Sequence, residues 1–397
     1  MDVTVTASEA TEDGPHSLLG LAVNRADVPA AGGGLDDASW VRALTGFVSF
    51  IPHTARLQVS VEEVAAPAIR MQLPWQPALI GDPHRHLVHG GVLTMFADTL
   101  CGSAVLTGLE RPEVCPTLDL RLDHYRPGVE GMALIGEARV LRVTESMVFT
   151  EAQIWQQPGK LLCRAIGNFV RLGARNTPPG FGEALMAAAQ GRPSMGAAGS
   201  VIDDPQKTAD DEALPVVSQP FVSRPGDGLQ HARRFVEGQR TRGDLADLLA
   251  SLPYARAIGL GLCSLAPSSL AEDDPLPTTP LRYAMAAMPE NVGNPMLPAV
   301  HGGVLAAAME TAATLEVLRL NGCGGRQARL PKLIDFSIDY LATARGDSVT
   351  RIDCEVLREG RRMANVRVSA WQQSSQRPVA SARMHFVLEP LAREEEA

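Results

Sequence analysis

The chain has 397 residues, an apolar content of 45% and a formal net charge of −9 at pH 7. This length accommodates two domains of ordinary size with connecting segments, and the apolar content suffices for two hydrophobic cores. The negative charge argues against nucleic acid as the main partner.

Residues 1–37 are polar and glycine-rich without a hydrophobic period, which predicts a mobile segment. They are acidic where a signal peptide would need a basic stretch followed by an apolar core, so we expect a soluble, cytoplasmic protein. A short amphipathic helix is expected at 37–50, and two strand-like runs follow at 55–64 and 68–73. A loop at 81–88 then leads to the most apolar part of the chain.

The apolar run at 92–109 contains one charge, Asp98, and two glycines. A helix that is apolar on nearly all sides must be buried on most of them. The run is too short and too interrupted to predict a membrane span, so no membrane partner is expected. At least three strands follow and complete a first domain, which we place at 38–172.

A segment rich in proline, glycine and alanine, 173–243, predicts a partly disordered linker with one helical piece at 182–188. A second domain is expected at 244–390, because the same order of elements returns there. Its apolar run, 304–315, also contains one charge, Glu310. The charged tail, 391–397, is expected to be free.

The start of each apolar run carries the same motif. Residues 89–93 read His-Gly-Gly-Val-Leu, and residues 301–305 repeat these five residues 212 positions later. In both copies a carboxylate, Asp98 or Glu310, follows the histidine by nine residues. The repeat continues into the strands, where Asp119 and Asp335 are 216 residues apart. Two such copies indicate a duplicated domain built around a chemical site.

The glycines and the acids of this motif suggest a reaction. The first N–H groups of a helix lack internal partners, so the Gly90 and Gly302 amides are candidates for holding an oxyanion; close packing is the structural alternative. A carboxylate in an apolar helix is costly unless it is paired or protonated. Asp98 and Glu310 are therefore candidate nucleophiles or general bases, and the sequence does not choose between these two roles.

The spacing also predicts how the parts combine. Nine helical residues place the acid half a turn round and about 13 Å along the axis from the glycine of its own helix. A site that needs both groups is easier to build across two antiparallel helices. We therefore expect one site to join Asp98 with Gly302 and the other to join Glu310 with Gly90.

Together, the histidine-glycine-glycine motif, the acid nine residues later and the following Thr117-Leu118-Asp119-Leu120 strand resemble the PaaI-like acyl-CoA thioesterases, which have the hotdog fold. The resemblance implies an α+β architecture of two hotdog domains, each an antiparallel sheet wrapped around a long apolar helix. It implies that the two pair into an internal pseudo-dimer, and it leaves further homo-oligomers open. The implied reaction is hydrolysis of an acyl-CoA or acyl-carrier thioester, without metal or redox cofactor.

The resemblance also implies two unequal sites. A threonine or serine near the start of the following strand helps to hold water, and Thr117 matches it, whereas the second copy has Leu333. An asparagine or glutamine six residues before the histidine helps to bind the carbonyl, but proline stands there in both copies, and Asn294 is one residue off. We therefore expect the site with Asp98 to carry most activity. The expected substrate-binding residues are His89, His301, Asn294, Gly91 and Gly303, the histidines mainly fixing the loop.

The motif residues also bear on two other functions. A non-catalytic acyl-CoA-binding or regulatory module is favoured by the missing asparagine or glutamine and disfavoured by the two acids. A hydratase of related fold does not fit the order of His89 and Asp98. The six cysteines form no Cys-x-x-Cys pair, so no metal site is predicted from them. Candidate contacts for CoA phosphates are His84, Arg85, His86, Arg121, Arg126, Arg139 and Arg142.

Overall fold

The computed structural model describes residues 17–19, 21–82, 85–192, 242–263, 280–320 and 329–390. The expected mobile segment, 1–37, and the expected linker, 173–243, fall partly outside these ranges, and the expected tail, 391–397, falls wholly outside.

The chain just before the first helix is anchored to the first unit. Val28 is only 2% exposed, and the Gly32 N–H donates to the Thr107 carbonyl over 2.8 Å. The buried carboxylate of Glu137 accepts hydrogen bonds from the Ser17 hydroxyl and the Leu18 N–H. The described part of the predicted mobile segment is thus packed, because its apolar and polar groups find partners on the first unit.

The first unit follows the expected order of elements. Its elements are α1 (Asp37–Phe50), α2 (Pro52–Arg56), β1 (Ser60–Ala65), β2 (Ala68–Leu73), the 3-10 turn η1 (Pro77–Leu79), β3 (Ile80–Asp82), β4 (Leu87–Val88), α3 (Gly90–Thr107), β5 (Thr117–His124), β6 (Leu134–Val143), β7 (Met147–Gln157), β8 (Lys160–Val170) and α4 (Phe181–Ala189). The predicted helices at 37–50 and 182–188 and the predicted strand at 68–73 are confirmed.

The second unit repeats this order. Its elements are α6 (Arg242–Ala250), α7 (Pro253–Ala257), β9 (Leu260–Leu262), β10 (Arg282–Met285), η2 (Pro289–Asn291), β11 (Val292–Asn294), β12 (Ala299–Val300), α8 (Gly302–Leu320), β13 (Arg329–Tyr340), β14 (Thr350–Glu359), β15 (Met363–Trp371) and β16 (Ala380–Pro390).

The predicted strand at 55–64 is wrong in its first half, where the chain forms the end of α2. Pro52 stands at the start of this short helix, a position that its fixed φ favours. The Thr54 hydroxyl donates back to the Val48 and Ile51 carbonyls and holds the turn between α1 and α2. Strand β1 therefore begins only at Ser60.

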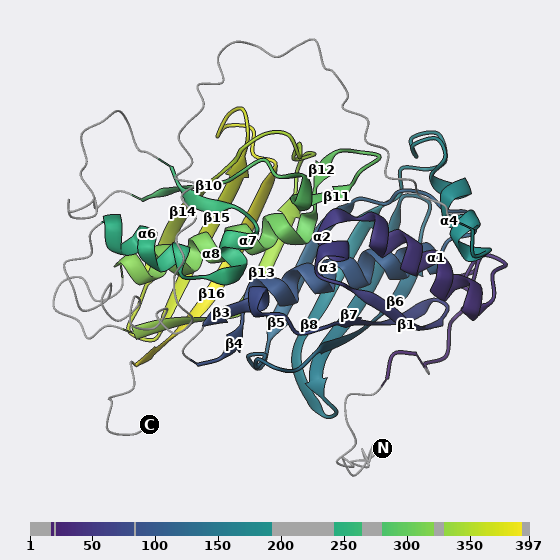
Figure 1. The fold of residues 1–397 in the computed structure, drawn as a ribbon, viewed down its shortest axis with the longest axis horizontal. Coiled ribbons are helices and arrows are strands. Elements are labelled where there is room, and N and C mark those ends of the chain that lie inside the picture. The colour runs from purple at the N-terminus through teal and green to yellow at the C-terminus, as the bar shows by residue number, and fades with distance from the viewer. Residues whose placement is uncertain are drawn as a thin grey trace, which may run out of the picture.

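The two units share one sheet. It has 12 antiparallel strands in the order β1-β2-β6-β7-β8-β5-β13-β16-β15-β14-β10-β9. Strands β5 and β13 join the units edge to edge, with Asp119 opposite Asp339 and Asp123 opposite Asp335. Figure 1 shows both long helices, α3 and α8, against the same face of this sheet. The predicted hotdog pseudo-dimer is therefore observed.

Helix α3 is long and apolar enough to span a membrane by length and composition, but 89% of it is buried inside the protein. It packs against strands of its own unit and against α8. The second glycine of each motif allows this contact. A Cβ at Gly91 would lie 2.5 Å from the Ala307 Cβ, and one at Gly303 would lie 2.5 Å from the Met95 Cα.

This close approach predicts opposite effects for two alanine substitutions in α3. Gly91→Ala should lower the free energy of unfolding by about 1–3 kcal/mol, because the added methyl group forces the helices apart. Gly102→Ala should raise it by about 0.5–1 kcal/mol, because alanine is the better helix former and the nearest atom would be Phe169 Cε1 at 3.6 Å. Urea unfolding measures both; equal effects would contradict the close contact.

Candidate active site

Two polar centres form where the N-terminus of one core helix meets the middle of the other. A Cβ at Gly302, the first residue of α8, would lie 3.1 Å from Asp98 Oδ2 of α3. A Cβ at Gly90, the first residue of α3, would overlap the Glu310 carboxylate of α8. The structure thus brings together the pairs that the nine-residue spacing predicts. We call these places the Asp98 centre and the Glu310 centre.

Both carboxylate oxygens of Asp98 are hydrogen-bonded. The Thr117 hydroxyl donates to Oδ1 over 2.9 Å, and the Gly303 N–H donates to Oδ2 over 2.9 Å. His301 Nδ1 lies 3.4 Å from the same Oδ2. Asp98 therefore provides a hydrogen-bond acceptor for a backbone N–H in the first turn of α8. Its negative charge there also interacts favourably with the helix dipole. The predicted set of Asp98, Thr117, His301 and Gly302 comes together, with the acid already engaged.

The two motif histidines cap the helices that follow them. His89 Nδ1 accepts the Gly91 N–H over 2.9 Å, and His301 Nδ1 accepts the Gly303 N–H over 3.0 Å. Burial lowers the pKa of His89 to about 4 and also lowers the pKa of His301, although Asp98 opposes the latter shift. Both rings are therefore neutral at pH 7, which leaves the proton on Nε2.

Each Nε2 faces a threonine of the opposite helix. His89 Nε2 lies 3.1 Å from the Thr311 hydroxyl, and His301 Nε2 lies 3.3 Å from the Thr99 hydroxyl. Because each hydroxyl donates to the carbonyl four residues earlier, its oxygen is free to accept from the histidine. These bonds hold the glycine turns in place across the helix pair, which matches the loop-fixing role expected for the histidines.

The Glu310 carboxylate is buried but loosely held. Among the described residues, its side chain accepts one hydrogen bond, from the Thr94 hydroxyl to Oε2 over 3.3 Å. Burial raises the pKa of Glu310 to about 8, and the bond from Thr94 only partly opposes that shift. A buried carboxyl with this pKa is a strong base once it is deprotonated, and such groups cluster at functional sites.

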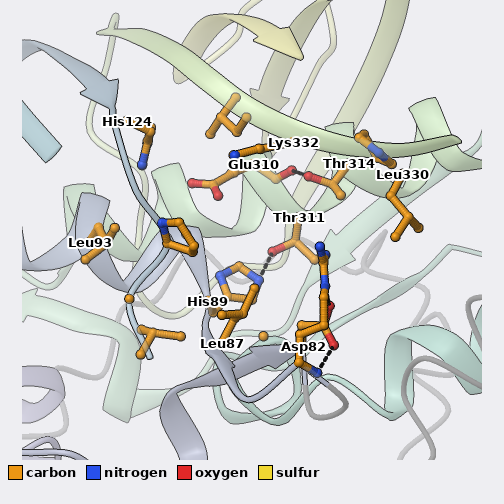
Figure 2. Close-up of a pocket in the computed structure, with 18 of the residues that line it drawn as sticks. Asp82, Leu87, His89, Leu93, His124, Glu310, Thr311, Thr314, Leu330 and Lys332 are labelled. Atoms are coloured by element: carbon orange, nitrogen blue, oxygen red, sulfur yellow. Dashed lines mark hydrogen bonds and ion pairs between the residues drawn. The ribbon is translucent and has the colours of Figure 1, made fainter. Parts of the chain in front are cut away.

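A pocket of about 240 Å³ opens beside Glu310. Figure 2 shows His89, Leu93, His124 and Glu310 around it, with Lys332 on the adjoining strand. Nine of the lining residues are aliphatic: Leu87, Val88, Leu93, Leu248, Leu252, Leu315, Leu318, Leu330 and Leu333. Three cationic residues complete it: Arg85, Arg126 and Lys332. The pocket therefore belongs to the centre that the sequence ranks second.

Three of the predicted substrate-binding residues make contacts within the protein. Asn294, at the end of β11, accepts the Met296 N–H through Oδ1 over 3.0 Å and is thus engaged within its own loop. Gly91 and Gly303 lie in the contact between the two helices. Leu333 lines the pocket at the position that corresponds to Thr117 in the repeat.

Two residues that the sequence analysis did not single out complete the centres. His124 ends β5 and Tyr340 ends β13, 216 residues apart, so they are equivalent positions of the repeat. His124 Nε2 and the Tyr340 hydroxyl are buried and have no hydrogen-bond partner among the described residues. An unpaired buried polar group costs about 1–3 kcal/mol, which marks both positions as functional candidates.

These positions had a signal in the sequence. Leu120 and Leu122 of β5 are buried under α3, and period-2 alternation puts residue 124 on the same inner face. His124 accordingly lines the pocket at the Glu310 centre. A Cβ at Gly302 would lie 3.2 Å from the Tyr340 hydroxyl, so Tyr340 belongs to the Asp98 centre.

Comparison with known proteins agrees with this duplicated architecture. Residues 86–163 and residues 297–379 each match the model of the thioesterase superfamily. The chain belongs to the thioesterase superfamily. The first matched region carries Gly90 and Asp98, and the second carries Gly302 and Glu310. Each centre combines the glycine of one region with the acid of the other. Neither region of this thioesterase can therefore build a centre alone.

Individual relatives cover different parts of the thioesterase. A predicted esterase of Halobacterium salinarum is 32% identical over 101 residues, which span 25% of this chain and 66% of that protein. A solved Pseudomonas aeruginosa protein is 34% identical and covers 34% of this chain and 99% of its own, with a TM-score of 0.31. An acyl-CoA thioesterase II from Mycobacterium marinum is 12% identical and covers 87% of this chain and 99% of its own, with a TM-score of 0.44.

Proposed function

We propose that this thioesterase hydrolyses aliphatic acyl-CoA thioesters at the Glu310 centre. The observation that carries the proposal is the leucine-lined pocket, which ends at the carboxylate of Glu310 and the first amide of α3, at Gly90. Its volume of about 240 Å³ is below the roughly 300–1,000 Å³ of pockets for drug-sized ligands. It therefore suits an acyl group and its thioester, with the nucleotide outside.

The charges support CoA as the carrier. Arg85 and Lys332 line the pocket with side chains that are about half exposed, and within the described part of the chain they form ion pairs with Asp82 and Glu389. Exposed ion pairs are weak and screened by salt, so a polyphosphate can compete for these cations. Arg126 adds a third positive charge to the lining.

The proposed reaction uses the groups that the pocket brings together. Water adds to the thioester carbonyl carbon while Glu310 accepts its proton as general base. The negative charge that develops on the carbonyl oxygen is stabilised at the N-terminus of α3 by the Gly90 amide. The carbon–sulfur bond then breaks, and the thiolate of CoA takes up a proton, which leaves a carboxylic acid and CoA.

A nucleophilic Glu310 would give a different isotope pattern. Attack by Glu310 forms an acyl-enzyme anhydride, and water then cleaves it. If the water attacks the Glu310 carbonyl, single turnover in ¹⁸O-labelled water puts the label into Glu310, which peptide mass spectrometry detects. The general-base route puts the label only into the released acid, and this is the result we expect.

A thiol-release assay on acyl-CoAs tests the function. We expect turnover with straight-chain aliphatic acyl groups and weaker turnover with benzoyl-CoA, because leucines outnumber Tyr125, the one phenol in the pocket lining. We also expect KM to rise with ionic strength as the cations are screened. Saturable binding of acyl-CoA without any release of thiol would instead favour the non-catalytic binding module.

A further inference from the structure

Neither copy of the motif carries an asparagine or glutamine six residues before its histidine, so the substrate carbonyl lacks one expected ligand. We propose that His124 fills this role at the Glu310 centre, where its Nε2–H donates a hydrogen bond to the thioester carbonyl. This inference rests on the proposed function, and it assigns a carbonyl-binding residue that comes from a strand rather than from the motif loop.

The position of His124 is suited to this role. His124 is the last residue of β5, the strand that joins the two halves of the sheet. It lies on the face of this strand that points toward the core helices. The pocket lining includes His124, Glu310 and Gly90 together. Figure 2 shows His124 on the side of the pocket toward which the Glu310 carboxylate is turned. A carbonyl placed at the first turn of α3 is thus accessible from His124.

The hydrogen-bonding state of His124 points to a ligand. Its Nε2 is buried in the wall of an open pocket and has no partner in the described part of the protein. The motif histidine of this pocket, His89, has both ring nitrogens engaged. His124 is therefore the imidazole of this centre that retains a free polar atom for the substrate.

The charge state of His124 fits a neutral donor. Burial lowers its pKa to about 4, although the nearby carboxylates of Asp123 and Asp335 act in the opposite direction. The ring therefore stays neutral over the range in which Glu310 titrates, and it can donate through Nε2 without adding a charge beside the base.

The repeat places a different group at the other centre. Tyr340 stands at the equivalent position. Its hydroxyl is buried next to Gly302 and has no hydrogen-bond partner within the described ranges. The carboxylate of that centre already accepts bonds from Thr117 and Gly303. Each centre thus has its own donor for the carbonyl. The imidazole of His124 lies at the loosely held carboxylate of Glu310, and the phenol of Tyr340 lies at the doubly hydrogen-bonded carboxylate of Asp98.

The test distinguishes a hydrogen bond from His124 to the substrate carbonyl from packing of the His124 ring against the acyl chain. It uses the full chain with hexanoyl-CoA, with the ketone analogue in which a methylene replaces the thioester sulfur, and with hexyl-CoA, a thioether that has no carbonyl. We expect His124→Phe to lower kcat/KM and to weaken binding of the ketone about 10- to 100-fold, while the thioether binds within about twofold of wild type.

His124→Gln is the matched variant, because its amide supplies an N–H of similar reach, and we expect it to recover most of the lost affinity. Thermal unfolding of His124→Phe should be no earlier than that of wild type, since the substitution removes an unpaired buried nitrogen. The apparent pKa of the pH–rate profile should stay unchanged, because His124 contacts the carbonyl and not the base.

The outcomes distinguish this inference from the proposed function. Equal weakening of ketone and thioether, or no weakening of either, overturns the role of His124 even when wild type is active. Selective loss of the ketone by Tyr340→Phe instead moves carbonyl binding to the Asp98 centre and also overturns it. A wild-type chain that binds both analogues without hydrolysing hexanoyl-CoA overturns only the proposed function.

Discussion

Glu310→Gln should lower kcat/KM for an aliphatic acyl-CoA by about 100- to 10,000-fold, the usual contribution of a general base. The amide keeps the size of the side chain and can still accept the hydrogen bond from Thr94, but it cannot take a proton from water. Stopped-flow or steady-state thiol release measures the loss. Binding of hexyl-CoA should change little, since the substitution leaves the leucine lining intact.

Asp98→Asn is the matched variant at the other centre, and we expect it to cost less than about tenfold in kcat/KM. Its amide oxygen can still accept the Gly303 N–H, and its amide nitrogen can donate to the Thr117 hydroxyl. The start of α8 therefore keeps its partners. If Asp98→Asn removes more activity than Glu310→Gln, the Asp98 centre is the main one, as the sequence analysis expected.

The second large effect is in the pH dependence of the rate. Because burial raises the pKa of Glu310 to about 8, only its deprotonated form, dominant above that pH, can act as a base. We expect kcat/KM to rise about tenfold per pH unit below pH 8 and to level off above it, so that the rate at pH 6 is about 100-fold below the plateau. A pH-independent rate between pH 6 and 9 would contradict this role.

Four buried groups near Glu310 have pKa values outside this range. Burial lowers the pKa of His89 and of His124 to about 4. Burial, with Glu310 as a second cause, raises the pKa of the Tyr254 hydroxyl and of the Cys163 thiol far above neutrality. A rise in rate centred near pH 8 therefore reports on Glu310.

The same pKa has a consequence for stability, which serves as a control. The folded state holds the Glu310 proton more tightly than the unfolded chain, so this group stabilises the fold below pH 4.5 and that contribution is lost as the pH rises toward 8. A glutamine does not titrate. The Tm of Glu310→Gln relative to wild type should therefore increase between pH 5 and pH 9. A constant difference in Tm would show that folding does not raise the pKa of Glu310.

The amino-acid sequence alone was enough to predict a duplicated unit with a buried core helix, and the resemblance to PaaI-like thioesterases implied that each unit is a hotdog domain. A run such as 92–109, with Asp98 as its single charge, can be stable only inside a core, and its repetition at 304–315 doubles the unit. The nine-residue spacing from motif histidine to acid also predicted that each centre joins the two helices, because helical geometry alone keeps Asp98 away from Gly90.

Only the tertiary structure shows that a pocket opens beside Glu310 and that His124 and Tyr340 complete the two centres. Sequence matching favoured Asp98 because Thr117 accompanies it, yet Thr117 and the Gly303 amide occupy both oxygens of that carboxylate. Glu310 keeps its carboxylate loosely held beside a pocket whose walls come from loops, α6 and strands of both units. Hydrogen-bond saturation and pocket shape depend on distances between residues far apart in the chain, and a local pattern contains no such distances.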